Sequence, residues 1–200
     1  QFDSVYHEHY SYLSFSTVCR IFNDNGLSVF DVTELPTHGG SLRVFAQRTD
    51  TGRRQVSDTV DRLLSQERTA GIHDERFYSG FQGKAEKVKN EFLCFLVAAK
   101  RQGKTVAAYG AAAKGNTLLN FAGVRPDLLQ FVVDKNPAKQ DMFLPGSRIP
   151  IVSDGVIWAR KPDYIVILPW NIKGEIVAQL EGVRDWGGEF VVAVPGLEVI

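Results

Sequence analysis

The alternation of short apolar runs with helical patterns after Gly103 is the feature that most restricts the fold of this chain. The apolar runs lie at 105–109, 131–134, 164–168 and 190–194, and helical patterns lie between them at 116–122, 154–160 and 172–183. Strands without a polar face are buried on both sides, as in a parallel sheet covered by helices. The pattern predicts an α/β, Rossmann-like lobe with a mostly parallel four-stranded sheet and flanking helices.

The first half of the chain has a different pattern. A helix is expected from Tyr12 to Asn23, and two alternating runs, 29–35 and 41–46, are expected to form an antiparallel pair. The polar, arginine-containing segment from Gln47 to Asp58 is interpreted as a solvated linker, with an anion site as the alternative. Two more helices follow, the second from near Asp74 to Gly103.

We therefore expect three regions along the chain. Residues 1–48 are the terminal helix and strands of a larger domain, residues 49–102 are a helical connector, and residues 103–200 are the Rossmann-like lobe. The chain opens with Gln-Phe-Asp rather than Met and is interpreted as a piece of a longer protein.

Charge and composition exclude several classes of partner. The formal net charge is zero, so no overall field attracts nucleic acid or an anionic membrane. The longest apolar runs are too short to span a bilayer. Cys19 and Cys94 each lie among apolar residues, which favours buried thiols in a reducing cytoplasm over a disulfide framework.

The segment Tyr6-His7-Glu8-His9, just before the first helix, groups proton donors and acceptors that work near neutral pH. Three interpretations remain open for it. It is a general base beside an orienting acid, a solvated entry to the helix, or part of a metal site for which no third ligand is evident nearby.

The segment Gly110-Ala111-Ala112-Ala113-Lys114-Gly115-Asn116 follows the first predicted strand and opens a helix. It matches the dinucleotide-binding pattern with the middle glycine replaced by alanine. Small residues here let backbone N–H groups at a helix start approach a phosphate. Asp134, at the end of the second predicted strand, has the position of a ribose-binding acid. The alternative is a tight turn that binds nothing.

Two further sets of residues are candidates because of where they lie. Trp170 and Asn171 follow the third predicted strand, and ligands bind beyond the carboxyl ends of such strands. Trp170 is able to stack on a ring, whereas Asn171 either bonds a ligand or caps the next helix. His38 lies in the turn Pro36-Thr37-His38-Gly39-Gly40, where it is either functional or simply a polar turn residue.

Together these segments resemble SAM-dependent C-methyltransferases that act on nucleotide-linked keto-deoxysugars. The resemblance rests on four ordered motifs, which are Tyr-His-Glu-His-Tyr at 6–10, Glu-Leu-Pro-Thr-His-Gly-Gly-Ser-Leu-Arg at 34–43, Gly-Ala-Ala-Ala-Lys-Gly-Asn-Thr at 110–117, and Leu-Pro-Trp-Asn at 168–171. It implies that residues 1–48 end a SAM-binding domain and that residues 103–200 bind the nucleotide sugar.

The resemblance also implies the cofactors. S-adenosylmethionine is expected to bind mainly to an upstream domain against which this chain packs, and zinc is expected in an N-terminal module, with none in this chain. No Gly-rich SAM loop or cysteine cluster occurs in these 200 residues, so the chain alone is expected to be catalytically inert.

The mechanism that the resemblance implies begins with removal of the C3 proton of a 4-keto sugar, and the enolate carbon then attacks the methyl group of SAM. His9 is the expected base, while Tyr6 and Glu8 polarise the keto oxygen or orient the imidazole. His38 is expected to line the same cleft. Residues 110–116 with Asp134, Trp170 and Asn171 are expected to hold the nucleotide diphosphate and to face His9 across a shared crevice.

The expected partner is thus a nucleotide-diphosphate sugar in the cytoplasm, with no nucleic acid and no membrane. Two other functions compete with this one. The loop and Asp134 also suit an NAD(P)-binding lobe of an oxidoreductase, although the methyl group of Ala112 would crowd a pyrophosphate. A non-catalytic interaction domain is the third possibility.

Overall fold

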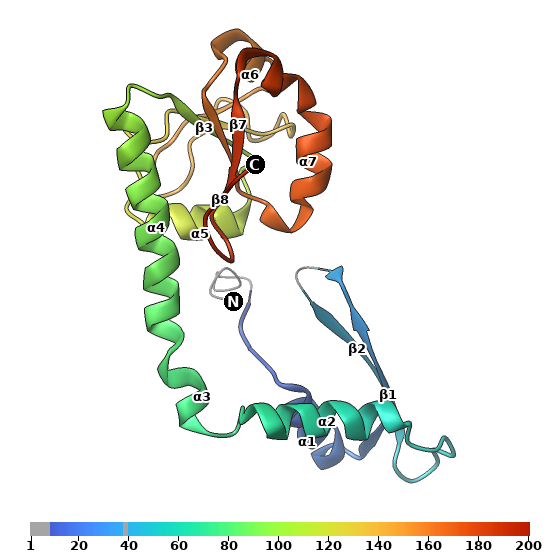
Figure 1. Ribbon diagram of the computed structural model, residues 1–200. Coiled ribbons are helices and arrows are strands. Elements are labelled where there is room, and N and C mark those ends of the chain that lie inside the picture. Colours follow the sequence, from blue (N-terminus) through green and yellow to red (C-terminus); the bar gives the residue numbers. More distant parts are fainter. Residues whose placement is uncertain (1–8, 38–39) are drawn as a thin grey trace. The chain divides into compact units, whose positions relative to one another are not determined.

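The computed structural model describes residues 9–37 and 40–200, which form two units (Figure 1). One unit is Tyr10–Gln82, and the other contains Gly83–Ile200. In the ranges described, no helix combines the length and the apolar character that crossing a membrane requires.

The unit Tyr10–Gln82 is built on a pair of antiparallel strands, as the sequence predicts. Its elements are helix α1 (Phe15–Asp24), strands β1 (Leu27–Leu35) and β2 (Ser41–Arg48), helix α2 (Asp58–Ala70) and the short helix α3 (Glu75–Ser79). A small core of Phe15, Val29, Val32 and Val60 joins the two longer helices to β1. Glu67 of α2 accepts hydrogen bonds from the first two N–H groups of α1, which fixes one helix against the other.

The second unit contains a six-stranded sheet in the order β5-β4-β3-β6-β7-β8. Its strands are β3 (Val106–Tyr109), β4 (Val132–Val133), β5 (Ile151–Val152), β6 (Tyr164–Ile167), β7 (Glu189–Val192) and β8 (Glu198–Val199). Strands β3 to β7 are parallel to one another, and β8 is antiparallel to β7. The α/β, mostly parallel sheet is confirmed. The predicted number of four strands is corrected to six. Strands β5 and β8 have only two residues each, which is too short for an alternation of apolar and polar residues to be recognised in the sequence.

Helices cover both faces of this sheet. Helices α4 (Phe81–Arg101) and α5 (Ala113–Phe121) pack on one face, where Val106 and Ala108 of β3 point. Helices α6 (Gly155–Arg160) and α7 (Lys173–Gln179) pack on the other face, with the alternate residues Ala107 and Tyr109. Two 3₁₀ segments, η3 (Trp170–Ile172) and η4 (Glu181–Trp186), flank α7. The predicted helix 172–183 is therefore divided.

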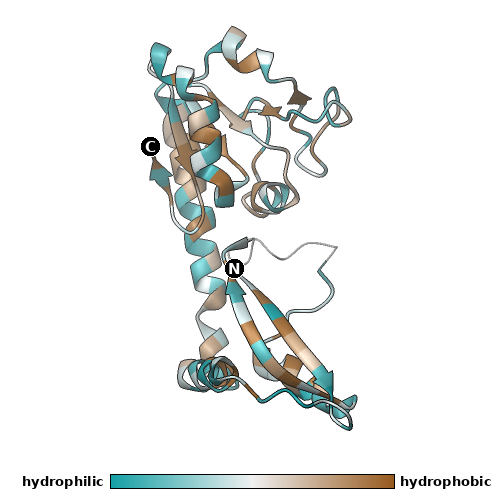
Figure 2. Cartoon of the chain, turned by 90° about the vertical axis from the view of Figure 1, so that its right-hand side faces the viewer, coloured by the Kyte–Doolittle hydropathy of each residue, from teal (hydrophilic) through white to brown (hydrophobic). Residues whose placement is uncertain are grey.

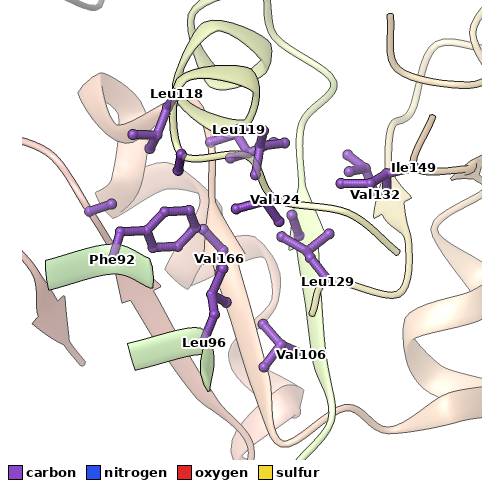
Figure 3. Close-up of a cluster of buried hydrophobic side chains, with 14 of the residues drawn as sticks. Phe92, Leu96, Val106, Leu118, Leu119, Val124, Leu129, Val132, Ile149 and Val166 are labelled. Atoms are coloured by element: carbon purple, nitrogen blue, oxygen red, sulfur yellow. The ribbon is translucent and has the colours of Figure 1, made fainter. Parts of the chain in front are cut away.

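Helix α4 belongs to the core of this unit. Figure 3 shows Phe92 and Leu96 of α4 beside Leu118 of α5 and Val166 of β6, and all four side chains are fully buried. The colours of α4 alternate between hydrophilic and hydrophobic bands (Figure 2), as expected of a helix with one face on a sheet. Cys94 lies on the outer face and is exposed, so the expected buried thiol is wrong there, and Cys19 is half-buried.

The strand order positions a site. The chain runs from β3 outward to β4 and β5, then returns to the other side of β3 as β6. The connections that follow β3 and β6 lead to opposite faces of the sheet, because α5 packs on one face and α7 on the other. The carboxyl ends of these two strands are therefore a topological switch point, where open α/β sheets bind ligands.

Candidate ligand-binding site

The loop from Gly110 to Gly115 lies at this switch point, and its two glycines permit close packing. Gly110 has φ +86°, and a Cβ there would lie 2.6 Å from Cδ of Pro169. A Cβ on Gly115 would lie 2.6 Å from Cβ of Leu168. Both glycines thus let the loop and the start of α5 approach the end of β6, as the first and last glycines of the dinucleotide-binding pattern do.

Several N–H groups of the predicted phosphate cradle are bonded within the protein. The amide of Gly110 donates to Val133 O at 2.7 Å, that of Ala111 to Asp134 Oδ2 at 2.8 Å, and that of Ala112 to Gly110 O at 2.8 Å. The first three amides of the cradle expected over 110–116 are therefore engaged within the protein, and the rest of the cradle is the first turn of α5, which begins at Ala113. Ala112, the N-cap residue, supplies no side-chain hydrogen bond to that turn.

Asp134 is bound to the protein itself. Its carboxylate accepts hydrogen bonds from Ala111 N and Asn136 N, both at 2.8 Å, and from Lys139 Nζ at 3.1 Å. Partial burial, the largest single influence, raises the pKa of Asp134, but these hydrogen bonds together hold that pKa below its ordinary value. The predicted role of Asp134 as a ribose acceptor would therefore add a fourth donor to a carboxylate that already accepts three hydrogen bonds.

Lys114, Trp170 and Asn171 form a cluster between the start of α5 and the end of β6. Lys114 Nζ donates to Asn171 Oδ1 and lies 4.8 Å from the centroid of the Trp170 ring. The N-cap residue of α7 is Ile172, without a side-chain bond. The expectation that Asn171 caps this helix is therefore wrong, because its carbonyl oxygen serves Lys114 instead.

A pocket of about 890 Å³ opens on the other side of the loop. Helix α5 forms one wall, and the segment between β4 and β5 forms the opposite wall. Its lining residues are Ala111, Ala112, Ala113, Asn116, Thr117, Asn120, Ala138, Lys139, Met142, Phe143, Leu144, Pro145 and Ile151. The predicted loop residues 111–113 and Asn116 are therefore brought together here, and Trp170 and Asn171 are not among the residues that line it.

Sequence reasoning indicated a surface loop with some role over 135–150 but named none of the residues that form this wall between β4 and β5. Met142 and Phe143 are 59% and 62% exposed although neighbouring backbone is held by hydrogen bonds, such as Asn120 Nδ2 to Pro145 O at 2.9 Å. Two adjacent large apolar residues in a Pro- and Gly-rich loop are the sequence signal that was available. Adjacent exposed apolar side chains that also line a pocket make this loop a candidate ligand surface.

The proposed catalytic segment falls mostly outside the described residues. The described residues do not include Tyr6, His7 or Glu8, nor do they include His38 in the turn over 36–40. His9 is described, and it is exposed in the irregular segment that precedes α1. Within residues 9–37 and 40–200, no group of three or more His, Cys, Asp or Glu side chains is arranged to hold a metal ion.

A sequence comparison identifies the family of the chain. Residues 36–195 match the C-methyltransferase C-terminal domain family, which is most of the chain, so the chain belongs to this family. A similar protein is "C-methyltransferase NovU" from Streptomyces niveus, which is 38% identical over 200 residues. The alignment covers 100% of this chain and 47% of that protein, so the chain spans about half the length of its relative.

Proposed function

We propose that this chain is the C-terminal portion of a SAM-dependent enzyme that C-methylates a nucleotide-linked 4-keto-deoxysugar. The observation that carries the proposal is the pocket of about 890 Å³ beside the loop at the switch point. Its volume suits a nucleotide-sized ligand. The family to which the chain belongs supports methyl transfer to carbon as the reaction.

In this proposal the lobe binds the nucleotide diphosphate. The first turn of α5 presents N–H groups and the positive end of the helix dipole, which stabilise a phosphate. Lys139 supplies a full positive charge in the same pocket. Met142 and Phe143 supply an apolar surface for the nucleoside or the deoxysugar, both of which have faces with few hydroxyl groups.

The proposed chemistry begins at His9. Its neutral imidazole accepts the proton from C3 of the sugar, and the electron pair of the broken C–H bond moves into the C3–C4 bond while the C4 carbonyl electrons move to oxygen. Tyr6 and Glu8 act on the keto oxygen or orient the imidazole. A positioned base of this kind contributes roughly 10²–10⁴ in rate.

S-adenosylmethionine supplies the methyl group that the substrate carbon receives. This proposal gives the loop at the switch point to the nucleotide sugar, and no Gly-rich SAM loop occurs in these 200 residues. We therefore assign SAM to a domain upstream of this chain, and we expect the chain to be inert without it.

Calorimetric titration of the 200-residue chain with dTDP and with NADH tests the proposed binding role. We expect dTDP to bind and NADH neither to bind nor to compete. Binding of NADH alone would support an oxidoreductase lobe instead. If neither ligand bound at millimolar concentration, a non-catalytic interaction domain would replace the proposal.

A further inference from the structure

Three hydrogen-bond donors converge on the carboxylate of Asp134. Ala111 N and Lys139 Nζ share Oδ2, at 2.8 and 3.1 Å, and Asn136 N bonds Oδ1 at 2.8 Å. The side chain of Asp134 is only 13% exposed. With two donors on Oδ2 and one on Oδ1, most of the acceptor capacity of this carboxylate is used within the protein, where it holds the groups that bond to it.

The ammonium group of Lys139 makes two hydrogen bonds within the protein and retains a third N–H group. Its ammonium donates to Ala111 O at 3.0 Å and to Asp134 Oδ2 at 3.1 Å. An ammonium has three N–H groups, so one is left for a ligand. The side chain is 42% exposed. Among the described residues that line the pocket, it is the one charged side chain.

Lys139 offsets the negative charge that Asp134 places near the proposed phosphate site. Asp134 places a negative charge directly against the amide of Ala111, at the loop that the proposed diphosphate approaches. Without a nearby cation, that charge would repel a phosphate, since like charges a few ångströms apart disfavour each other. Lys139 both neutralises Asp134 and adds an attractive donor.

We propose that Lys139 binds the diphosphate of the nucleotide sugar, and that Asp134 is a positioning residue that acts through Lys139 rather than a ribose-binding residue. The inference rests on the proposed function of this lobe as a nucleotide-sugar site. It also assigns the loop between β4 and β5 a part in binding, in addition to the loop after β3.

Binding of dTDP and of inorganic pyrophosphate to the 200-residue chain tests the role of Lys139. We expect Lys139→Met to weaken both ligands by about ten-fold, because a hydrogen bond to a charged group is lost and partial exposure moderates the loss. Lys139→Arg, which keeps the charge, should recover most of the affinity. Lys135→Met is the matched control, since Lys135 is an exposed lysine in the same loop that does not line the pocket.

Unchanged binding by Lys139→Met, or an equal loss in Lys135→Met, would overturn the inference while leaving the proposed function intact. A wild-type chain that binds neither dTDP nor pyrophosphate would overturn both. Thermal unfolding of each variant, monitored by circular dichroism, checks that the binding measurements are made on folded protein.

A double-mutant cycle tests the role of Asp134. If Asp134 acts through Lys139, Asp134→Asn should weaken both ligands in the wild-type background and should strengthen their binding in the Lys139→Met background, where the unpaired carboxylate repels the phosphates. A purely structural role would give the same loss in both backgrounds. A ribose-binding role would weaken dTDP and spare pyrophosphate, and either result would contradict the positioning role.

Discussion

Phe143 is exposed on a loop that the protein holds in place, and this arrangement leads to a prediction about a single side chain. The backbone on either side is fixed, because Ile151 N donates to Met142 O at 2.8 Å and Leu144 N donates to Ile149 O at 2.9 Å. We expect Phe143→Ala to weaken dTDP binding by about 1–2 kcal/mol, in the range of aromatic–base stacking, and to leave pyrophosphate binding unchanged. Calorimetric titration with the two ligands measures the difference.

Phe77→Ala is the matched control for this substitution. Phe77 is also an exposed phenylalanine, 50% accessible, but it lies in α3 and belongs to the other unit. Equal affinity of wild type and Phe143→Ala for dTDP would exclude Phe143 from the nucleoside surface. A loss of pyrophosphate affinity would mean that the substitution disturbs the loop as a whole.

His9 is the residue on which the proposed chemistry depends. In the enzyme that contains the upstream domain, we expect His9→Ala to lower kcat by about 10²–10⁴, because proton removal then lacks its positioned acceptor. The affinity for SAM should stay unchanged. Steady-state kinetics and SAM titration measure the two quantities, and His73→Ala, at an exposed histidine in the turn before α3, is the control. Equal losses of kcat and SAM affinity would indicate a structural role for His9.

The strands of the sheet differ in how well they could be predicted from the sequence. Strands β3, β4, β6 and β7 are apolar on both faces, so their local pattern reports their burial directly. Strands β5 and β8 depend on pairing with distant neighbours and have no pattern of their own. Lys139 was missed for the same reason. Its position is set by Ala111 and Asp134, and no spacing along the chain reveals these bonds.

The amino ends of β3 and β6 are joined by Asp163, which gives a prediction about pH. Lys104 Nζ, at 2.7 Å, with Thr105 N and Thr105 Oγ1, both at 2.8 Å, lowers the pKa of Asp163 to about 2. A lowered carboxyl pKa stabilises the fold above the ordinary value, 3.8, and this contribution is lost as the pH falls from about 4 towards 2.

We expect Asp163→Asn to destabilise the protein by about 1–2 kcal/mol at pH 7, a figure reduced for partial exposure of the carboxylate. The difference between wild type and Asp163→Asn should shrink between pH 4 and pH 2, because the carboxyl becomes protonated over this range, first in the unfolded chain and then in the folded protein. Urea unfolding at several pH values measures it. Asp127→Asn is the control, since Asp127 pairs with Lys100 at the surface, where its side chain is 61% exposed. A difference that is constant from pH 7 to pH 2 would contradict this account.

The division of the whole chain is best tested with fragments, because the sequence and the structure suggest different starts for the second unit. The sequence places the start of the lobe at residue 103 and treats the preceding helix as a connector, whereas the unit seen in the structure includes Gly83 onward. Phe92 and Leu96 are 0% exposed and Ala99 is 3% exposed, all within the core that contains β3. Burial of a large apolar side chain contributes about 1.5–3 kcal/mol, and a domain is stable by only about 5–15 kcal/mol.

We therefore expect residues 83–200 to fold cooperatively and residues 103–200 to lack a cooperative unfolding transition, as measured by circular dichroism during heating. Fragment 83–200 should also bind dTDP as tightly as the 200-residue chain, because the residues that line the pocket all lie between Ala111 and Ile151. Within this fragment, Phe92→Ala should cost about 3–5 kcal/mol, and Cys94→Ala, on the exposed side of the same helix, should cost little. Equal melting temperatures for the two fragments would mean that α4 only connects the units, as the amino-acid pattern alone suggests.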